Sequence, residues 1–507
     1  MLRSAAAVGA ATTSSRVLGY VRDMVIATTF GAGPAADAFF VAFRIPNFLR
    51  RLFAEGAFTQ AFVPVLAEYR TVRTQAEVRD LVAHVLGTLA AVLLAVAVLA
   101  VLAAPLLVWL LAPGFGNDPA RGELTGTLLR ITFWYLPLVS LAAAVGGVLN
   151  TFGRYFTPAL TPLFLNLAMI AAALWLAPQL NVPVLALALG VVCGGLLQLL
   201  WQLPSLASIG CLARPRLGFG HPGVRRIMSL MVPGIFGSSV AQINLMFDTI
   251  LASFLVTGSV SWLYYADRLV EFPLGVLAIA FATVILPRLS QQHAGGDDQA
   301  FSRTLDWGLR WVVLVGAPAA LALLVLAGPL LSTLFNYGAF DAHSVVMARR
   351  ALWAFAPGLL AFMAIKVLVP GYYARQDTRT PVRIGIIAML TNMVLALTLI
   401  WPFEHAGLAA ATSLAAYLNA LLLLRGLRRS GVYRPQSGWP RFAARVVTAT
   451  AVMGCVLWLG TGSLDDWLLR SGAERLAHMA LWVAGGGACY AATLLLLRLP
   501  LAALRHP

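Results

Sequence analysis

The chain has 507 residues, of which 60% are hydrophobic and only 11% are charged, and its mean hydropathy is +0.83. Soluble domains average about 25% charged residues, so this composition excludes a soluble globular protein and indicates one embedded in a bilayer. The formal net charge is +16, but the arginines stand between apolar runs, so the sequence predicts no nucleic-acid partner.

Fourteen segments are predicted to be transmembrane helices, because each offers about 20 mostly apolar residues. The long Leu/Ala/Val runs lack the alternating polarity of membrane strands, so the predicted fold class is an all-α integral membrane protein. The first two segments carry several charges and are the weakest by hydropathy. The predicted spans lie near 6–29, 36–64, 82–112, 124–150, 158–178, 183–204, 227–255, 260–287, 308–335, 346–372, 382–401, 406–427, 442–461 and 476–498.

Arginine-rich connections alternate with arginine-poor ones along the chain. Roughly twenty arginines fall in one alternate set of connections and at most about five in the other, and positively charged loops stay cytoplasmic. The arginine-rich set includes the connections at 66–80, 205–226 and 425–441. Both termini are therefore predicted to be cytoplasmic. Dropping either of the first two spans would invert every later loop, which supports counting them.

The cysteines and histidines do not form a recognisable metal motif. The seven histidines include no HExxH pair, and the four cysteines have no CxxC spacing. The sequence therefore predicts neither a disulfide framework nor a zinc site, and it indicates no cofactor. The cysteines are Cys193, Cys211, Cys455 and Cys489, all in or beside apolar runs.

Two parts of the chain align with each other in the same order. Ser14-Ser15 falls on Ser238-Ser239, and the same offset places Arg44 on Arg268. Shared membrane composition could produce such matches, but their common order favours a duplication of six helices, with the last two helices outside it. Transporters often place a substrate site at such a repeat interface. The expected parts are an N-terminal lobe at 1–222, a C-terminal lobe at 223–430 and a two-helix appendix at 431–507.

Three of the predicted helices carry an unusual number of charges. A centred Arg, Lys or Asp costs at least about 2.5–3.5 kcal/mol, so these side chains must face the bundle interior, a water-filled cavity or the interfaces. On the second helix, at about 100° per residue, most of the polar side chains share one face, and Arg50 projects from another side. The charges are Arg16, Arg22 and Asp23 on the first helix; Asp37, Arg44, Arg50, Arg51 and Glu55 on the second; and Asp267, Arg268 and Glu271 on the eighth.

Two interpretations of these charges are open. In the first, the acids and arginines are structural pairs, with Asp23 and Asp267 as the expected partners of arginine. Alternatively, the slight excess of arginine binds an anionic ligand, since the planar guanidinium matches phosphate oxygens bidentately. The excess favours the second interpretation for part of the set.

The chain resembles one known family over almost its whole length, and four stretches carry the resemblance. They are SSRVLGYVRD, FGAGPAADAFFVAFRIPNFLRRLFAEGAFTQAFVPVLAEY, TGSVSWLYYADRLVEFPLGV and VLVPGYYARQDTRTPV. They resemble the MurJ, or MviN, family of lipid II flippases, within the multidrug/oligosaccharidyl-lipid/polysaccharide exporter superfamily. The resemblance implies fourteen helices, in two six-helix lobes around a central cavity. It also implies two extra C-terminal helices that form a groove for the undecaprenyl tail.

The resemblance also implies site residues. Some members bind sodium through an acid on the seventh helix, where Asp248 is the acid in this chain and Asn392 a candidate partner. Coupling to sodium, protons or the membrane potential is left open. The essential cavity arginines correspond to Arg16, Arg22, Arg50 and Arg268, and Ser15, Asp37, Arg51 and Glu55 match further cavity positions.

The sequence therefore predicts a flippase, not an enzyme, in the bacterial cytoplasmic (inner) membrane. It would move undecaprenyl-linked lipid II from the inner to the outer leaflet by alternating access. Membrane lipids are expected partners, and cell-wall synthesis proteins are candidate ones. One alternative is an exporter of another lipid-linked oligosaccharide or of drugs, although the arginines would repel cationic drugs. Another is an integral-membrane glycosyltransferase or polymerase, but the outward connections offer only scattered acids.

Overall fold

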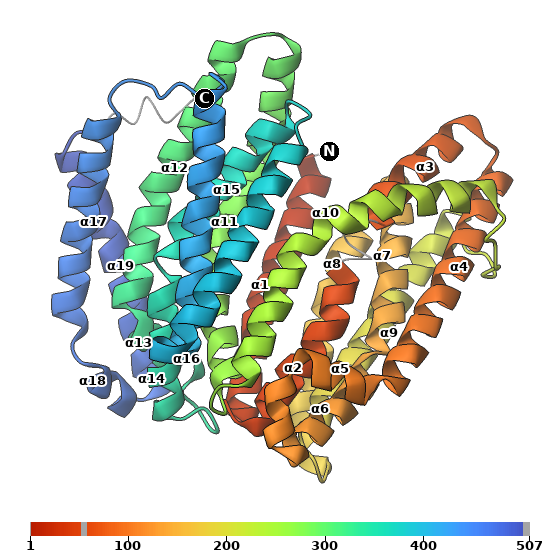
Figure 1. Cartoon of the computed structure of the whole chain (residues 1–507), viewed down its shortest axis with the longest axis horizontal. Helices are drawn as coiled ribbons and strands as arrows, with labels where there is room; N and C mark the ends of the chain where they lie inside the picture. Colours follow the sequence, from red (N-terminus) through yellow and green to blue (C-terminus); the bar gives the residue numbers. More distant parts are fainter. Residues whose placement is uncertain (1, 52–57, 500–507) are drawn as a thin grey trace. The chain divides into compact units, whose positions relative to one another are not determined.

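The computed structural model describes residues 2–51 and 58–499, apart from the side chains at 2–8, 10, 232–241 and 276–284. Throughout the described residues the chain consists of helices and connections, without a β-strand, in agreement with the predicted all-α class (Figure 1). The chain forms two compact units, Met1–Val260 and Ser261–Pro507.

Helices of very different length make up the two units. The first unit holds α1 (Leu2–Phe30), α2 (Pro34–Arg50), α3 (Thr59–Val72), α4 (Gln75–Leu102), α5 (Ala104–Leu111), η2 (Pro113–Asn117), α6 (Pro119–Thr132), α7 (Tyr135–Thr151), α8 (Phe156–Ala171), η3 (Ala172–Leu176), η4 (Ala177–Gln179), α9 (Leu185–Ser208) and α10 (Pro222–Ser253). Helix α11 (Ser259–Ala294) starts at the boundary. The second unit continues with α12 (Asp298–Val325), α13 (Ala327–Phe335), α14 (Ala342–Phe355), α15 (Gly358–Tyr373), α16 (Arg379–Arg429), α17 (Trp439–Thr461), α18 (Leu464–Leu469) and α19 (Gly472–Leu496).

The expected count of fourteen spans is not confirmed by length and composition. Within the described residues, eight helical segments are long and apolar enough to cross a bilayer, or nine if the bent pair α14–α15 counts as one span. One of the eight, α16, covers two predicted spans. They are separated by a turn of the backbone at Glu404, where φ is 50° and ψ is −130°. Helices α1, α2, α10 and α11 form where spans were predicted but are not among the eight.

The seventh predicted helix, α10, belongs to the first compact unit, where it packs against α3, α4 and α5. A buried core joins α3, α4, α7 and α9, with Phe62, Leu81 and Val148 fully buried. The start of α4 is fixed by a capping box, in which Thr74 Oγ1 accepts from the Glu77 N–H and Glu77 Oε2 accepts from the Thr74 N–H. The division into two lobes and an appendix stays a prediction.

In the second unit, α17 and α19 pack against each other, and they also pack on α12 and α13. A buried acid of α12 anchors the segment that leads into α17. Asp306 Oδ1 accepts from Tyr433 Oη at 2.9 Å, from the Gln436 N–H at 3.1 Å and from Trp439 Nε1 at 2.6 Å. Its Oδ2 accepts from Arg310 Nε at 2.7 Å. Four donors therefore converge on one carboxylate that is 2% exposed.

A buried arginine, Arg475, anchors the start of α19. Arg475 Nε donates to Trp467 O at 2.8 Å, and its Nη2 donates to Leu468 O at 2.7 Å, both near the end of α18. Its Nη1 donates to Ser332 O at 3.1 Å and to Asn336 O at 3.0 Å, at the end of α13. The guanidinium thus satisfies carbonyls at two helix C-termini, where positive charge is favourable.

Candidate functional site

Arg22 and Asp23 form a buried polar cluster on α1. Arg22 Nε and Nη2 donate to Asp23 Oδ1 at 3.0 and 2.7 Å, and Nη1 donates to Asn166 Oδ1 of α8 at 3.0 Å. Asn166 Nδ2 in turn donates to the backbone oxygen of Ser15 at 3.1 Å. The expected pairing of Asp23 with an arginine is confirmed. Sequence reasoning missed Asn166, because no local pattern relates α8 to α1.

Arg16 lies on the same helix as this cluster but is exposed. Six residues separate it from Arg22, which corresponds to about 9 Å along the helix axis. Among the described residues, no acidic side chain pairs with Arg16. Within that part of the chain its charge is therefore not neutralised by an acid, as a ligand-binding role requires.

The arginines of α2 differ in their surroundings. Arg50 is half-buried, and its Nε donates to Asn47 Oδ1 at 2.9 Å, one turn earlier. Arg44 Nη1 donates to Thr249 Oγ1 of α10 at 2.7 Å. Arg51 is exposed at the helix end. Glu55, the remaining predicted residue of this stretch, lies outside the described residues.

Asp37 is fully buried near the start of α2. Its Oδ2 accepts from Arg121 Nη2 at 2.6 Å and from the Gly258 N–H at 2.7 Å. The Arg121 guanidinium also lies 3.8 Å from the centre of the Phe115 ring. Asp37 thus connects α2 to α6 and to the α10–α11 connection, and the predicted contact of Asp37 with substrate would require these bonds to open. No local sequence pattern relates Arg121 to Asp37.

Arg268 belongs to the second unit, on α11. Its Nη1 donates to Glu271 Oε2 at 2.8 Å, and its guanidinium lies 5.3 Å from the centre of the Tyr264 ring. The Arg268 side chain is 31% exposed, so the pair is not sealed from its surroundings. The four predicted arginines therefore come from both units, and their joint cluster stays a prediction.

The predicted ion-coupling residues also come from both units. Asp248 is half-buried on α10, and its Oδ2 accepts from Asn244 Nδ2 at 3.5 Å, one turn earlier. Asn392 is 1% exposed on α16. Amide and carboxylate oxygens are ligands for hard cations, so each position has suitable chemistry. Their pairing stays a prediction.

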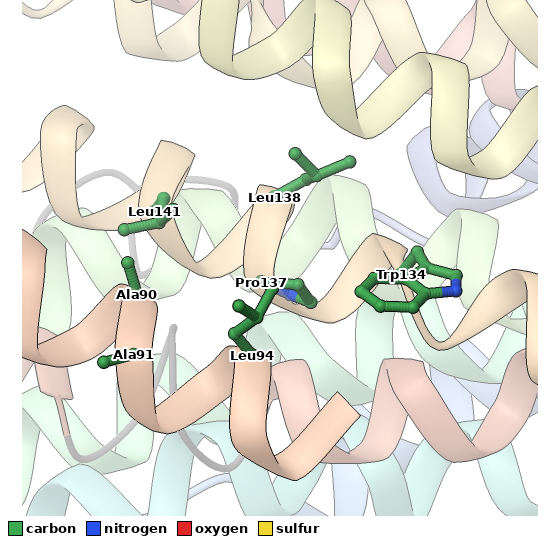
Figure 2. A pocket seen from close by; sticks show the side chains of 7 residues that line it. All are labelled: Ala90, Ala91, Leu94, Trp134, Pro137, Leu138 and Leu141. Atoms are coloured by element: carbon green, nitrogen blue, oxygen red, sulfur yellow. The ribbon is translucent and has the colours of Figure 1, made fainter. Parts of the chain in front are cut away.

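An apolar cavity of about 360 Å³ lies between α4 and α7 (Figure 2). Figure 2 shows the side chains from the two helices facing each other across it. The cavity is lined by no charged side chain, and its only polar side-chain group among the lining residues is the Trp134 indole N–H, so it suits hydrocarbon rather than a polar head group. Its lining residues are Ala90, Ala91, Leu94, Trp134, Pro137, Leu138 and Leu141.

Comparison with known proteins gives consistent results. A model of the family described as "Lipid II flippase MurJ" matches residues 26–477. The "Probable lipid II flippase MurJ" of Vibrio cholerae serotype O1 is 49% identical over 98% of this chain and 96% of its own length. A solved structure, "Lipid II flippase MurJ, inward closed conformation", has a TM-score of 0.81 at 25% identity, covering 96% of this chain and 97% of that one.

A second solved structure is similar in fold alone. It is an inward-facing multidrug resistance MATE family transporter of the MOP superfamily, with a TM-score of 0.70 at 14% identity. The match covers 82% of this chain and 95% of that one. One fold hosts many functions, so this likeness does not favour drug export.

Proposed function

The chain belongs to the lipid II flippase MurJ family, and from that premise we propose that it carries undecaprenyl-linked lipid II from the inner to the outer leaflet of the bacterial cytoplasmic membrane. The observation that carries the proposal is the match to this family along nearly the whole chain. A pyrophosphate–sugar–peptide head group is too polar to cross hydrocarbon unaided, so its passage needs a polar path. The family is one of flippases rather than enzymes.

The proposed mechanism assigns different parts of the lipid to different parts of the chain. Arg16, Arg22, Arg50 and Arg268 bind the pyrophosphate, since a guanidinium offers two parallel donors to phosphate oxygens. The undecaprenyl tail stays in hydrocarbon and follows the apolar surfaces of α17 and α19. The two lobes then alternate between inward-open and outward-open states. Enzymes that polymerise lipid II at the outer face are the protein partners that this role implies.

The proposed function is tested by following lipid II in cells depleted of the protein. A leaflet-resolved assay should find that lipid II accumulates in the inner leaflet as the protein disappears. Restoring the gene should return lipid II to the outer leaflet. An unchanged leaflet distribution after depletion would show that another protein does the flipping.

The proposed topology, with both termini cytoplasmic, predicts which positions an impermeant thiol reagent can reach. In a variant without the native cysteines, Leu217→Cys and Ser430→Cys should react only after the membrane is permeabilised. Asn117→Cys, on the opposite side by the arginine distribution, should react in intact spheroplasts. All three side chains are exposed, so access to reagent depends on the side of the membrane. Labelling of Leu217→Cys in intact spheroplasts would invert the topology.

Ion coupling through Asp248 is the next proposal. A carboxylate in a membrane helix is costly unless it binds a cation, takes a proton or is paired. Asp248→Asn keeps the side-chain shape and removes the charge. We expect lipid II flipping by this variant to lose the dependence on sodium or pH that the wild type shows, whereas Asp298→Asn, at an exposed site, keeps it. If the ion dependence of Asp248→Asn equals that of the wild type, Asp248 is not the coupling group.

A further inference from the structure

The connection between α9 and α10 runs closely along α4 in the first unit. The Arg216 N–H donates to Ala83 O at 3.0 Å, and the Gly218 N–H donates to Thr88 Oγ1 at 3.0 Å. The approach is so close that a Cβ at Gly87 would overlap the Arg216 backbone. These contacts bring the first turn of α10 beside residues of α4 that are far away in sequence.

Three metal-ligating side chains meet where the two segments touch. Asp80 and His84 lie one turn apart on α4, and His221 caps the start of α10. Asp80 Oδ2 is 3.3 Å from His84 Nδ1 and 3.5 Å from His221 Nε2. The two imidazole rings stack with their centres 5.0 Å apart. One ligand atom from each of the three residues lies within 4.8 Å of the others.

We propose that Asp80, His84 and His221 bind a divalent transition-metal ion of the zinc class. In a tetrahedral site with metal–ligand distances of about 2.0–2.2 Å, neighbouring ligand atoms are about 3.3–3.6 Å apart. The two oxygen–nitrogen separations already have this length. Two imidazoles with one carboxylate favour zinc and its neighbours over magnesium or calcium, which prefer oxygen ligands.

The surroundings leave room for the ion and a fourth ligand. The Asp80 side chain is 42% exposed, whereas the His84 and His221 side chains are 19% and 17% exposed. Water can therefore complete the coordination while the imidazoles stay fixed. Arg216 Nη1 lies 3.6 Å from Asp80 Oδ1, the other carboxylate oxygen, and so does not occupy the position of Oδ2.

In the metal-free form both imidazole nitrogens that would bind the ion carry a proton, so metal binding requires each histidine to change its tautomer. His221 Nδ1 accepts from the Gly223 N–H at 3.1 Å, which places the proton on Nε2 in the metal-free form. Coordination through Nε2 requires that proton to move to Nδ1, which breaks the hydrogen bond from the Gly223 N–H. His84 Nδ1, 2.9 Å from Asp80 O, likewise gives up its proton to the other ring nitrogen.

A bound ion would fasten α4 to the first turn of α10. Sequence motifs could not reveal this site, because His221 follows Asp80 and His84 only after several intervening helices. The proposal concerns the first unit alone and does not depend on the transported lipid. Its failure would therefore leave the proposed flippase function untouched.

The test is metal binding by the purified full-length protein, with Co²⁺ as a coloured substitute for Zn²⁺. Wild-type protein should bind one equivalent of Co²⁺ with the visible absorption of a four-coordinate ion, and Zn²⁺ should displace it. Asp80→Asn, which keeps the side-chain shape, and His84→Ala should each weaken binding at least tenfold. His478→Ala, at a half-buried histidine of α19 in the second unit, is the matched control and should bind like the wild type.

A second readout separates metal binding from misfolding. Zn²⁺ should raise the melting temperature of the wild type and of His478→Ala by mass action. It should not do so for Asp80→Asn or His84→Ala, whose melting temperatures without metal serve as the baseline. Equal Co²⁺ binding by all four proteins, or no Co²⁺ binding by the wild type, would overturn the proposal.

Discussion

Arg50→Ala should abolish lipid II flipping while the protein still inserts and accumulates normally. Arg50 is half-buried at the end of α2, and Asn47 Oδ1 holds its Nε at 2.9 Å, which orients the guanidinium fork. Hydrogen bonds to charged groups contribute about 1.5–3 kcal/mol each, so loss of a bidentate phosphate contact weakens lipid II binding roughly a hundredfold or more. Arg50→Lys keeps the charge but loses the fork, so it should bind lipid II with intermediate affinity.

The measurements are lipid II binding by purified protein and growth of a flippase-depleted strain at matched protein levels. Arg429→Ala removes an exposed arginine at the end of α16 and is the control for a change in net charge. Growth and binding of Arg50→Ala that match those of Arg429→Ala would leave Arg50 as a structural residue.

Among the substitutions proposed for this chain, Asp306→Asn should lower the free energy of unfolding most. The substitution keeps the side-chain shape but removes the charge that pairs with buried Arg310, and its amide group presents donors to other donors. Breaking one partner of a buried ion pair costs about 3–5 kcal/mol. Because Tyr433, Gln436 and Trp439 all donate to Asp306, the loss should loosen the segment leading into α17 first.

The free energy of unfolding in detergent, followed by tryptophan fluorescence, measures this effect. Limited proteolysis should cut near 431–441 earlier in Asp306→Asn than in the wild type. The matched control is Asp298→Asn, since Asp298 is exposed on the same helix. A difference below about 1 kcal/mol between the two variants would mean that the buried network contributes little.

The helical class followed from composition, and part of the polar site followed from the cost of burying charge. Asp23 needed a cationic partner, and Arg22 supplies it within the same helix. The sequence did not predict the partner of Asp37, because Arg121 looked like an ordinary loop arginine until α6 folded against α2. Asp306 was missed for the same reason, since all its donors except Arg310 lie far along the chain and no periodicity relates them to it.

Span boundaries show a different limit of sequence reasoning. The hydropathy pattern separates two spans within α16, and the structure turns there without a polar loop, at Glu404 just after Pro402. Proline removes a backbone donor and weakens the helix at that place. The charged helices α1 and α2 were counted as spans on the alternation of loop charge, since their own hydropathy is lowered by their charges.

The most direct test of the account is lipid II translocation in vesicles that contain only the purified protein. The informative variant replaces Arg16, Arg50 and Arg268 with alanine together and keeps Arg22, because losing Arg22 would leave Asp23 charged and buried. We predict that wild-type protein and Arg429→Ala move lipid II to the opposite leaflet, and that the triple variant does no better than protein-free vesicles. Translocation by the triple variant at the wild-type rate would contradict the arginine mechanism, and translocation by the wild type no faster than in empty vesicles would contradict the flippase function itself.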